Sequence, residues 1–111
     1  MAIQVTRENI DGAVVVTLEG SVDIYTSTEL RGELKVALDN QAPKLVVDMA
    51  GVTFVDSSGL ATLIEALQRI KRYEGSLSLC NLSKNVRGVF ELANLDSIFD
   101  IKASREAALG G

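Results

Sequence analysis

Three polar residues with usable side-chain chemistry lie between an apolar segment and an amphipathic one. The apolar segment ends at Val55, and Asp56, Ser57 and Ser58 follow it. Apolar residues then recur at helical spacing, which predicts a helix over residues 58–73. The first amide groups of a helix have no partner within the helix and favour a negative charge, either a carboxylate or a phosphate. The three polar side chains are therefore expected at a position that suits anions.

Two compatible roles follow for these side chains. Asp and Ser are preferred N-cap residues, so the simplest role is to bind the free amide groups of the first helical turn. A capping serine can also accept a phosphoryl group. Two adjacent serines beside Asp56 exceed what a single cap needs. The residues alone leave both roles open.

The sequence lacks the residues of several common enzyme sites. It contains no histidine, which removes the Ser-His-Asp triad and the commonest metal ligand. A hydrolase built on Ser57 or Ser58 would need a lysine base. Neither a P-loop nor a dinucleotide-binding glycine motif is present, and Asp48 with Asp56 makes too small a ligand set for a hard cation. We therefore expect no catalytic residues, no metal and no cofactor.

The segment Phe54-Val55-Asp56-Ser57-Ser58-Gly59-Leu60 resembles the signature of bacterial anti-sigma factor antagonists of the STAS domain family. The resemblance continues along nearly the whole chain, in the segments Gly20-Ser21-Val22-Asp23, Glu74-Gly75-Ser76-Leu77, Asn81-Leu82-Ser83 and Phe90-Glu91-Leu92-Ala93-Asn94-Leu95. Ala61 departs from the pattern, because many members have a second glycine there. The resemblance implies one STAS domain over residues 1–111, with Ser57 as the phosphoacceptor.

The resemblance also implies a partner-switching function. The unphosphorylated protein would bind an anti-sigma factor that is a serine kinase, and this binding would release the sigma factor. The kinase would supply magnesium and ATP, phosphorylate Ser57 and so end the complex, and a PP2C-type phosphatase would reset it. A phosphoserine adds about −1.5 to −2 charges. A helix N-terminus tolerates this charge, whereas a partner docked close to Asp56 would be repelled.

Three neighbours of Ser57 are expected to contribute to partner binding. Asp56 would orient the Ser57 hydroxyl or contact the kinase, although helix capping is its simpler role. Ser58 would support the cap and is a second candidate acceptor. Gly59 would allow close approach of the partner.

The loop before the first helix is expected to extend this surface. Asp23 would contact the partner, or only form a turn. Tyr25 and Thr26 would lie beside it. Thr26-Ser27-Thr28-Glu29 has the pattern of a capping box, which predicts the start of the first helix.

Two other functions are compatible with the same fold. A STAS domain can be a subunit of a transport complex, or it can bind a nucleotide or another small ligand at the same helix N-terminus. Neither needs a phosphoswitch, and Asp56-Ser57 favours the switch. A serine enzyme is a third alternative, which the missing histidine disfavours.

Hydrophobic periodicity predicts an α/β fold. Strands are expected at residues 3–9, 13–19, 44–49, 52–55, 76–81 and 97–101, with a hairpin turn at Asp11-Gly12. Further helices should follow Ser83 and Ser104. Strands separated by helices pair in parallel through right-handed crossovers. The prediction is a mixed, mostly parallel sheet with an N-terminal β-hairpin and about four helices. Asp48 is expected at a strand end and Cys80 in the core, and the strand order stays open.

Composition limits the partners and the compartment. With 111 residues and 47% hydrophobic content, the chain suits one domain with a sizeable core. A net charge of −4 gives no attraction to nucleic acid or to anionic membranes. The first seven residues lack a signal-peptide pattern, and no apolar run has bilayer length. The single cysteine cannot form an internal disulfide. We expect a cytoplasmic protein without direct nucleic-acid contact or membrane insertion.

Overall fold

The computed structural model describes residues 3–110, and the first element is an antiparallel hairpin. β1 (Gln4–Ile10) and β2 (Ala13–Val22) are joined by Asp11 and Gly12, which have φ angles of 50° and 86°. Positive φ at both positions is what a type I′ turn requires, so the predicted turn is confirmed. Met1 and Ala2, which begin the segment that lacks a signal-peptide pattern, lie outside the described residues.

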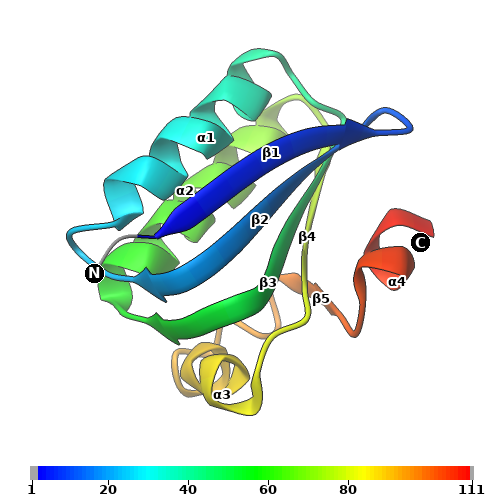
Figure 1. The fold of residues 1–111 in the computed structure, drawn as a ribbon. Helices are drawn as coiled ribbons and strands as arrows, with labels where there is room; N and C mark the ends of the chain where they lie inside the picture. Colours follow the sequence, from blue (N-terminus) through cyan, green and yellow to red (C-terminus); the bar gives the residue numbers. More distant parts are fainter. Residues whose placement is uncertain (1–2, 111) are drawn as a thin grey trace.

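Helices and strands alternate after the hairpin (Figure 1). These elements are, in order, α1 (Ser27–Asp39), β3 (Lys44–Val55), α2 (Ser57–Arg72), β4 (Ser76–Cys80), α3 (Lys84–Leu92), β5 (Asp100–Lys102) and α4 (Arg105–Gly110). Within residues 3–110 the five strands form one sheet in the order β1-β2-β3-β4-β5. Only β1 and β2 pair antiparallel, and the other neighbours pair in parallel, as predicted for the fold class.

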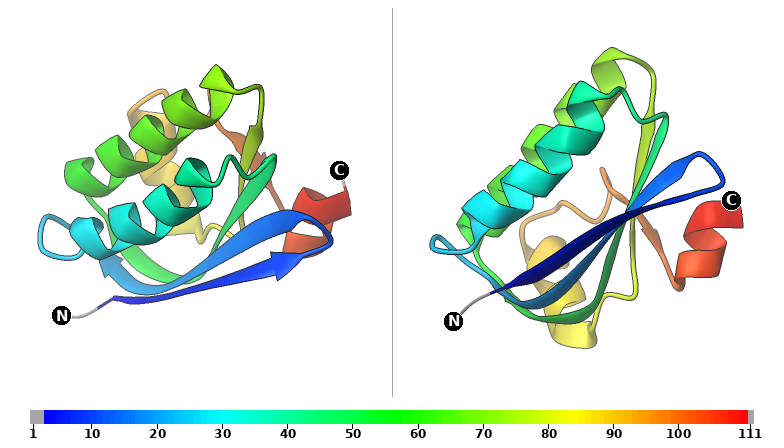
Figure 2. Two further views of the ribbon diagram at one scale, coloured as in Figure 1. Left: turned by 90° about the horizontal axis from the view of Figure 1, so that it is seen from above. Right: turned by 45° about the horizontal axis from the view of Figure 1, so that its top comes forward.

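The two faces of the sheet are covered differently (Figure 2). α1, α2 and α3 cover one face and enclose the main core, which contains the apolar side of α1 (Leu30, Leu34, Ala37 and Leu38). α4 covers part of the opposite face, where a small second cluster contains Val15, Val46, Cys80 and Ala108. None of the described helices is long and apolar enough to cross a membrane.

α1 begins at Ser27, as the capping-box pattern predicted, but the predicted capping box itself does not form. Thr26 is the N-cap residue, but its side chain makes no capping hydrogen bond. Its hydroxyl instead donates to the Ser21 carbonyl (2.7 Å) and accepts from the Asp23 N–H (2.9 Å). The hydroxyl therefore closes the loop before the helix, a role that depends on how the chain leaves β2.

The predicted break at Gly51 does not divide the third strand. β3 continues to Val55. Its pairing with β2 shifts register between Thr17 and Glu19 and between Gly20 and Ser21, and the two strands stay paired beyond these shifts. β2 is correspondingly longer than predicted and ends at Val22, opposite Val55. The expected position of Asp48 at a strand end is therefore wrong: it lies inside β3, where its carboxylate accepts hydrogen bonds.

The last strand begins later than predicted, at Asp100. Residues 94–99, which precede β5, form turns instead of a strand. Asn94 has a φ of 59°, and the Phe99 N–H donates to the Leu95 carbonyl. Phe99 is buried edge-on against Phe90, with ring centroids 5.6 Å apart. Ala93 is exposed because α3 ends just before it.

Candidate functional site

Asp56 connects the end of β3 to the start of α2. One oxygen of its carboxylate, Oδ1, accepts hydrogen bonds from the N–H groups of Ser58 (2.9 Å) and Gly59 (3.1 Å). The same oxygen accepts a third bond from the Ser58 hydroxyl (2.6 Å). The N-cap role predicted for Asp56 is therefore confirmed.

These contacts keep the Asp56 carboxylate charged. The hydrogen bond from the Ser58 hydroxyl contributes most to lowering the pKa of Asp56 below its ordinary value of 3.8. Partial burial opposes this effect, and the backbone N–H groups of Gly59, Ser58 and Ile24 reinforce it. Asp56 is thus a fixed negative charge at the start of α2.

Ser57 and Ser58 have different environments. Ser58 is half-buried, its hydroxyl is bound to Asp56, and its carbonyl accepts the Thr62 hydroxyl (2.9 Å). Ser57 is exposed, and within residues 3–110 its hydroxyl takes part in none of the side-chain hydrogen bonds. The carboxylate of Asp56 therefore orients Ser58 and not Ser57. An exposed, unengaged hydroxyl is the one that can enter the active site of another enzyme.

Gly59 has a different role from the one expected. It is buried, and a Cβ atom at this position would lie 2.8 Å from Val22 Cγ1 and 2.9 Å from Val55 Cγ1. The residue permits α2 to approach the ends of the protein's own strands. The expectation that Gly59 admits a partner is corrected, because these strands already occupy the space.

The loop at residues 23–26 lies beside this helix start. The Asp56 N–H donates to the Val22 carbonyl (3.0 Å), which joins the end of β2 to the beginning of α2. Asp23 Oδ1 accepts from the N–H groups of Tyr25 (2.9 Å) and Thr26 (3.1 Å), so the turn-forming role of Asp23 is present. Thr26 is only 3% exposed, and the prediction that it belongs to the partner surface is wrong because its hydroxyl is used inside the loop.

Three apolar side chains project into solvent around the same strand ends. Ile24 is 67% exposed, Tyr25 is 84% exposed and Phe54 is 51% exposed. Tyr25 was predicted on this surface, whereas Ile24 and Phe54 were missed. The sequence did show an isoleucine in a predicted loop and a phenylalanine next to Val55. Hydrophobic periodicity alone, however, does not distinguish an exposed apolar residue from a core residue. We call Ile24, Tyr25, Phe54 and Ser57 together the Ser57 surface.

Asp48 and Cys80 lie outside this region and contribute to the fold. Residues 3–110 contain no group of three or more acidic or cysteine side chains placed to hold a metal ion. Cys80 is fully buried, as predicted. Burial, followed by the negative charge of Asp48, raises the pKa of its thiol to about 11.

The comparisons with known proteins agree with the sequence resemblance. The family model described as STAS domain matches residues 4–108. The anti-sigma-B factor antagonist of Bacillus subtilis is 31% identical over 109 residues, which cover 98% of this chain and 99% of that protein. The crystal structure of an anti-sigma factor antagonist from Mycobacterium paratuberculosis superposes with a TM-score of 0.90 at 26% identity, covering 97% of this chain and 92% of that one.

A further structure shares the fold at lower identity. SpoIIAA of Bacillus in its phosphorylated form matches with a TM-score of 0.75 and 23% identity, covering 96% of this chain and 97% of that one. The order of elements, the match to the family model over most of the chain and the relative above 30% identity lead to one conclusion: this chain belongs to the STAS domain family.

Proposed function

We propose that this protein is an anti-sigma factor antagonist controlled by phosphorylation of Ser57. The unphosphorylated form binds an anti-sigma factor serine kinase and so releases the sigma factor. The kinase phosphorylates Ser57 and the complex dissociates, and a PP2C-type phosphatase restores the binding form. Two of the relatives named above are anti-sigma factor antagonists by name, and the structure of a third, SpoIIAA, is of its phosphorylated form; both observations support this proposal.

The contrast between the two serines carries this proposal. Ser57 is exposed at the first position of α2, whereas the Ser58 hydroxyl is bound to Asp56 at 2.6 Å. A kinase needs to place the acceptor hydroxyl in line with the γ-phosphate of ATP. Ser57 meets this need without rearrangement, and Ser58 would first have to give up its bond to Asp56. This difference favours Ser57 over Ser58 as the acceptor.

The cap also explains why a phosphate on Ser57 acts on the partner and not on the fold. The N–H groups of Ser58 and Gly59 are already bound to Asp56, so they are not free to bind the new phosphate. The phosphate would lie outside the first turn and next to a carboxylate. The helix dipole favours an anion there by about 0.3–1 kcal/mol, so the domain remains folded. Burying a doubly charged group beside Asp56 in an interface would cost several kcal/mol.

The exposed apolar side chains supply the attractive part of the interface. Ile24 and Tyr25 lie on the loop, and Phe54 lies on the strand, that end next to the start of α2. Large apolar and aromatic side chains that become buried on binding carry much of the affinity of an interface. The same surface therefore offers contact area to the kinase and exposes the serine that ends the contact.

The two non-switch alternatives are less well supported. A nucleotide or other anionic ligand at the start of α2 would need the amide groups that Asp56 already occupies. A transport subunit requires a membrane-protein partner, and nothing on the described surface favours that partner over a kinase.

The test is phosphorylation of matched variants. Wild type, Ser57→Ala and Ser58→Ala are incubated with magnesium-ATP and the candidate anti-sigma factor kinase, and their intact masses are measured. We expect one phosphoryl group on wild type and on Ser58→Ala, and none on Ser57→Ala. A phosphorylated Ser57→Ala would overturn the acceptor assignment. If wild type stays unmodified after incubation with each anti-sigma factor kinase encoded in its own genome, the proposed switch is overturned.

A further inference from the structure

The C-terminal helix α4 covers a small apolar strip on the second face of the sheet. Val15, Val46 and Cys80, from three adjacent strands, are fully buried there under Ala108 and Leu109. α4 has only six residues, so it is too short to be stable without its contacts to the sheet. Figure 2 shows it on the side of the sheet away from α1 and α2. The main core therefore lies on the other face and does not include this helix.

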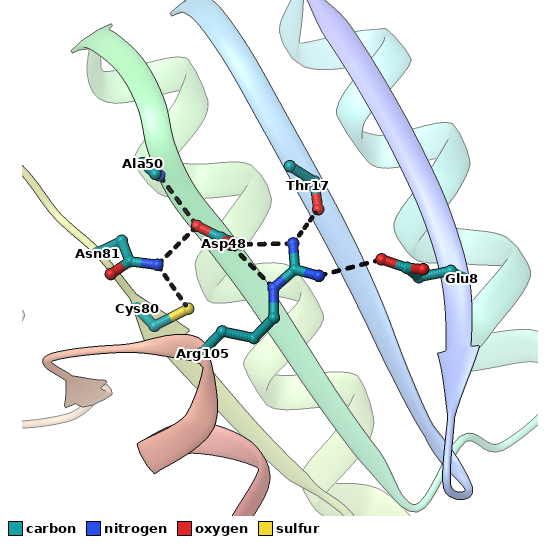
Figure 3. A network of polar contacts seen from close by, with 7 residues as sticks. All are labelled: Glu8, Thr17, Asp48, Ala50, Cys80, Asn81 and Arg105. Carbon is teal, nitrogen blue, oxygen red and sulfur yellow. Dashed lines mark hydrogen bonds and ion pairs between the residues drawn. The ribbon is translucent and has the colours of Figure 1, made fainter.

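A network of polar contacts centred on Arg105 attaches α4 to the sheet (Figure 3). The Arg105 guanidinium donates to Asp48 Oδ2 through Nε (3.0 Å), to Thr17 Oγ1 through Nη2 (2.8 Å) and to Glu8 Oε1 through Nη1 (3.1 Å). One side chain at the start of α4 thus contacts β1, β2 and β3. We call Arg105 with Glu8, Thr17 and Asp48 the Arg105 network.

The sheet does not depend on the Arg105 network for its own hydrogen bonds. Asp48 Oδ1 also accepts from the Ala50 N–H (3.1 Å) and from Asn81 Nδ2 (3.0 Å). If Arg105 moved away, this buried carboxylate would keep two donors. At the far end of the helix, the Lys44 ammonium donates to the Leu109 carbonyl (2.9 Å). Losing these attachments would remove α4 from the second face while leaving the strands and the main core paired.

The attachment is also open to competition from water. The Arg105 side chain is 30% exposed and that of its partner Glu8 is 55% exposed, so solvent can replace these contacts. Ala108 is the one residue of α4 that is buried, among the part of the helix that the structure describes. Segments held by few apolar contacts and by exposed polar ones open at a lower free energy than the whole domain.

We propose that α4 is a separately opening segment, held closed by the Arg105 network, whose release uncovers Val15, Val46 and Cys80 without unfolding the domain. Cys80 reports on the opening because it is the only cysteine in the chain and lies under the helix. α4 and the start of α2 lie on opposite sides of the molecule (Figure 1), so opening leaves the Ser57 surface unchanged.

The test is alkylation of Cys80 by iodoacetamide, followed by intact mass across low urea concentrations. Wild type, Arg105→Ala and Arg105→Lys are compared, with Arg87→Ala as the control. Arg87 is also an arginine in an ion pair, with Glu91 on the exposed side of α3. We expect a wild-type rate that barely changes with urea below the unfolding transition, because local opening exposes little surface.

Removing the guanidinium should raise the alkylation rate roughly tenfold to a hundredfold, as expected for losing hydrogen bonds to charged groups. The alkylation rate of Arg105→Lys should lie between those of Arg105→Ala and wild type. Lysine keeps the positive charge but lacks the several N–H donors of the planar guanidinium. Arg87→Ala should match wild type. A wild-type rate that rises steeply with urea in parallel with global unfolding would overturn the proposal. An Arg105→Ala rate equal to that of wild type would overturn the role of the network.

Discussion

At the residue scale, neighbouring positions around the helix start have distinct roles that depend on their contacts. Asp56 binds two amide groups and the Ser58 hydroxyl, whereas Ser57 is exposed and its hydroxyl makes no side-chain hydrogen bond to any of residues 3–110. The sequence predicted that these residues meet at a helix N-terminus, because capping is local in the chain. It did not predict which serine would be bound, because that depends on where the capping carboxylate points.

Gly59 gives a test of packing at this scale. Gly59→Ala would place a Cβ atom within 3 Å of Val22 and Val55, and we expect it to destabilise the protein by about 1–3 kcal/mol. At Gly32, on the exposed side of α1, a Cβ atom would meet no other atom within 4 Å, so Gly32→Ala should stabilise by up to about 1 kcal/mol. Urea unfolding measured by circular dichroism compares the two. If the two variants change the free energy of unfolding equally, α2 does not need the close approach to the strands that Gly59 permits.

At the element scale, the β2–α1 loop and the β3–α2 junction form one surface because parallel strands end at the same edge of a sheet. Val22 and Val55 are paired, so the segments that follow them lie together. Asp23 folds its loop through local amide contacts, which leaves Ile24 and Tyr25 outside. Local turn chemistry was predictable for Asp23. The Thr26 hydroxyl was not, because its acceptor lies back on β2.

Tyr25 tests this arrangement. We expect Tyr25→Ala to weaken binding to the kinase by about 1–3 kcal/mol, since a large exposed aromatic side chain would be buried on binding. The urea midpoint should stay unchanged. Val36→Ala removes another exposed apolar side chain, on α1, and should leave the affinity unaltered. Binding is measured by isothermal titration calorimetry. Equal affinities for both variants would exclude Tyr25 from the interface.

At the scale of the whole molecule, the sheet and its helices follow from the alternation of apolar strands and amphipathic helices. The fold class, the hairpin and the inward side of α1 were all predictable, because hydrophobic period and turn residues determine them. The strand order, the continuity of β3 through Gly51 and the contacts of Arg105 were not predictable, because each joins residues far apart in sequence.

Acid should destabilise the molecule through its aspartates. Burial works to raise the pKa of Asp48, but hydrogen bonds from Asn81, the Ala50 N–H and Arg105 outweigh it and hold the pKa below 3.8. The unfolded state then binds more protons in acid, so the stabilisation is complete above about pH 4 and is lost as the pH falls through the folded-state pKa. We expect the urea midpoint of the wild type to decrease as the pH is lowered below about 4. In Asp48→Asn the midpoint should decrease less steeply with falling pH. An identical slope in that variant would contradict the role of Asp48.

The proposed switch is tested most directly by the affinity of the kinase partner for the protein before and after phosphorylation of Ser57. Calorimetric titrations would use wild type in both states, with urea midpoints measured in parallel. We predict at least a hundredfold weaker binding after phosphorylation, equivalent to about 3 kcal/mol, with the urea midpoint preserved. Equal affinities of the two states, or loss of binding only through loss of folding, would contradict the proposed phosphorylation switch.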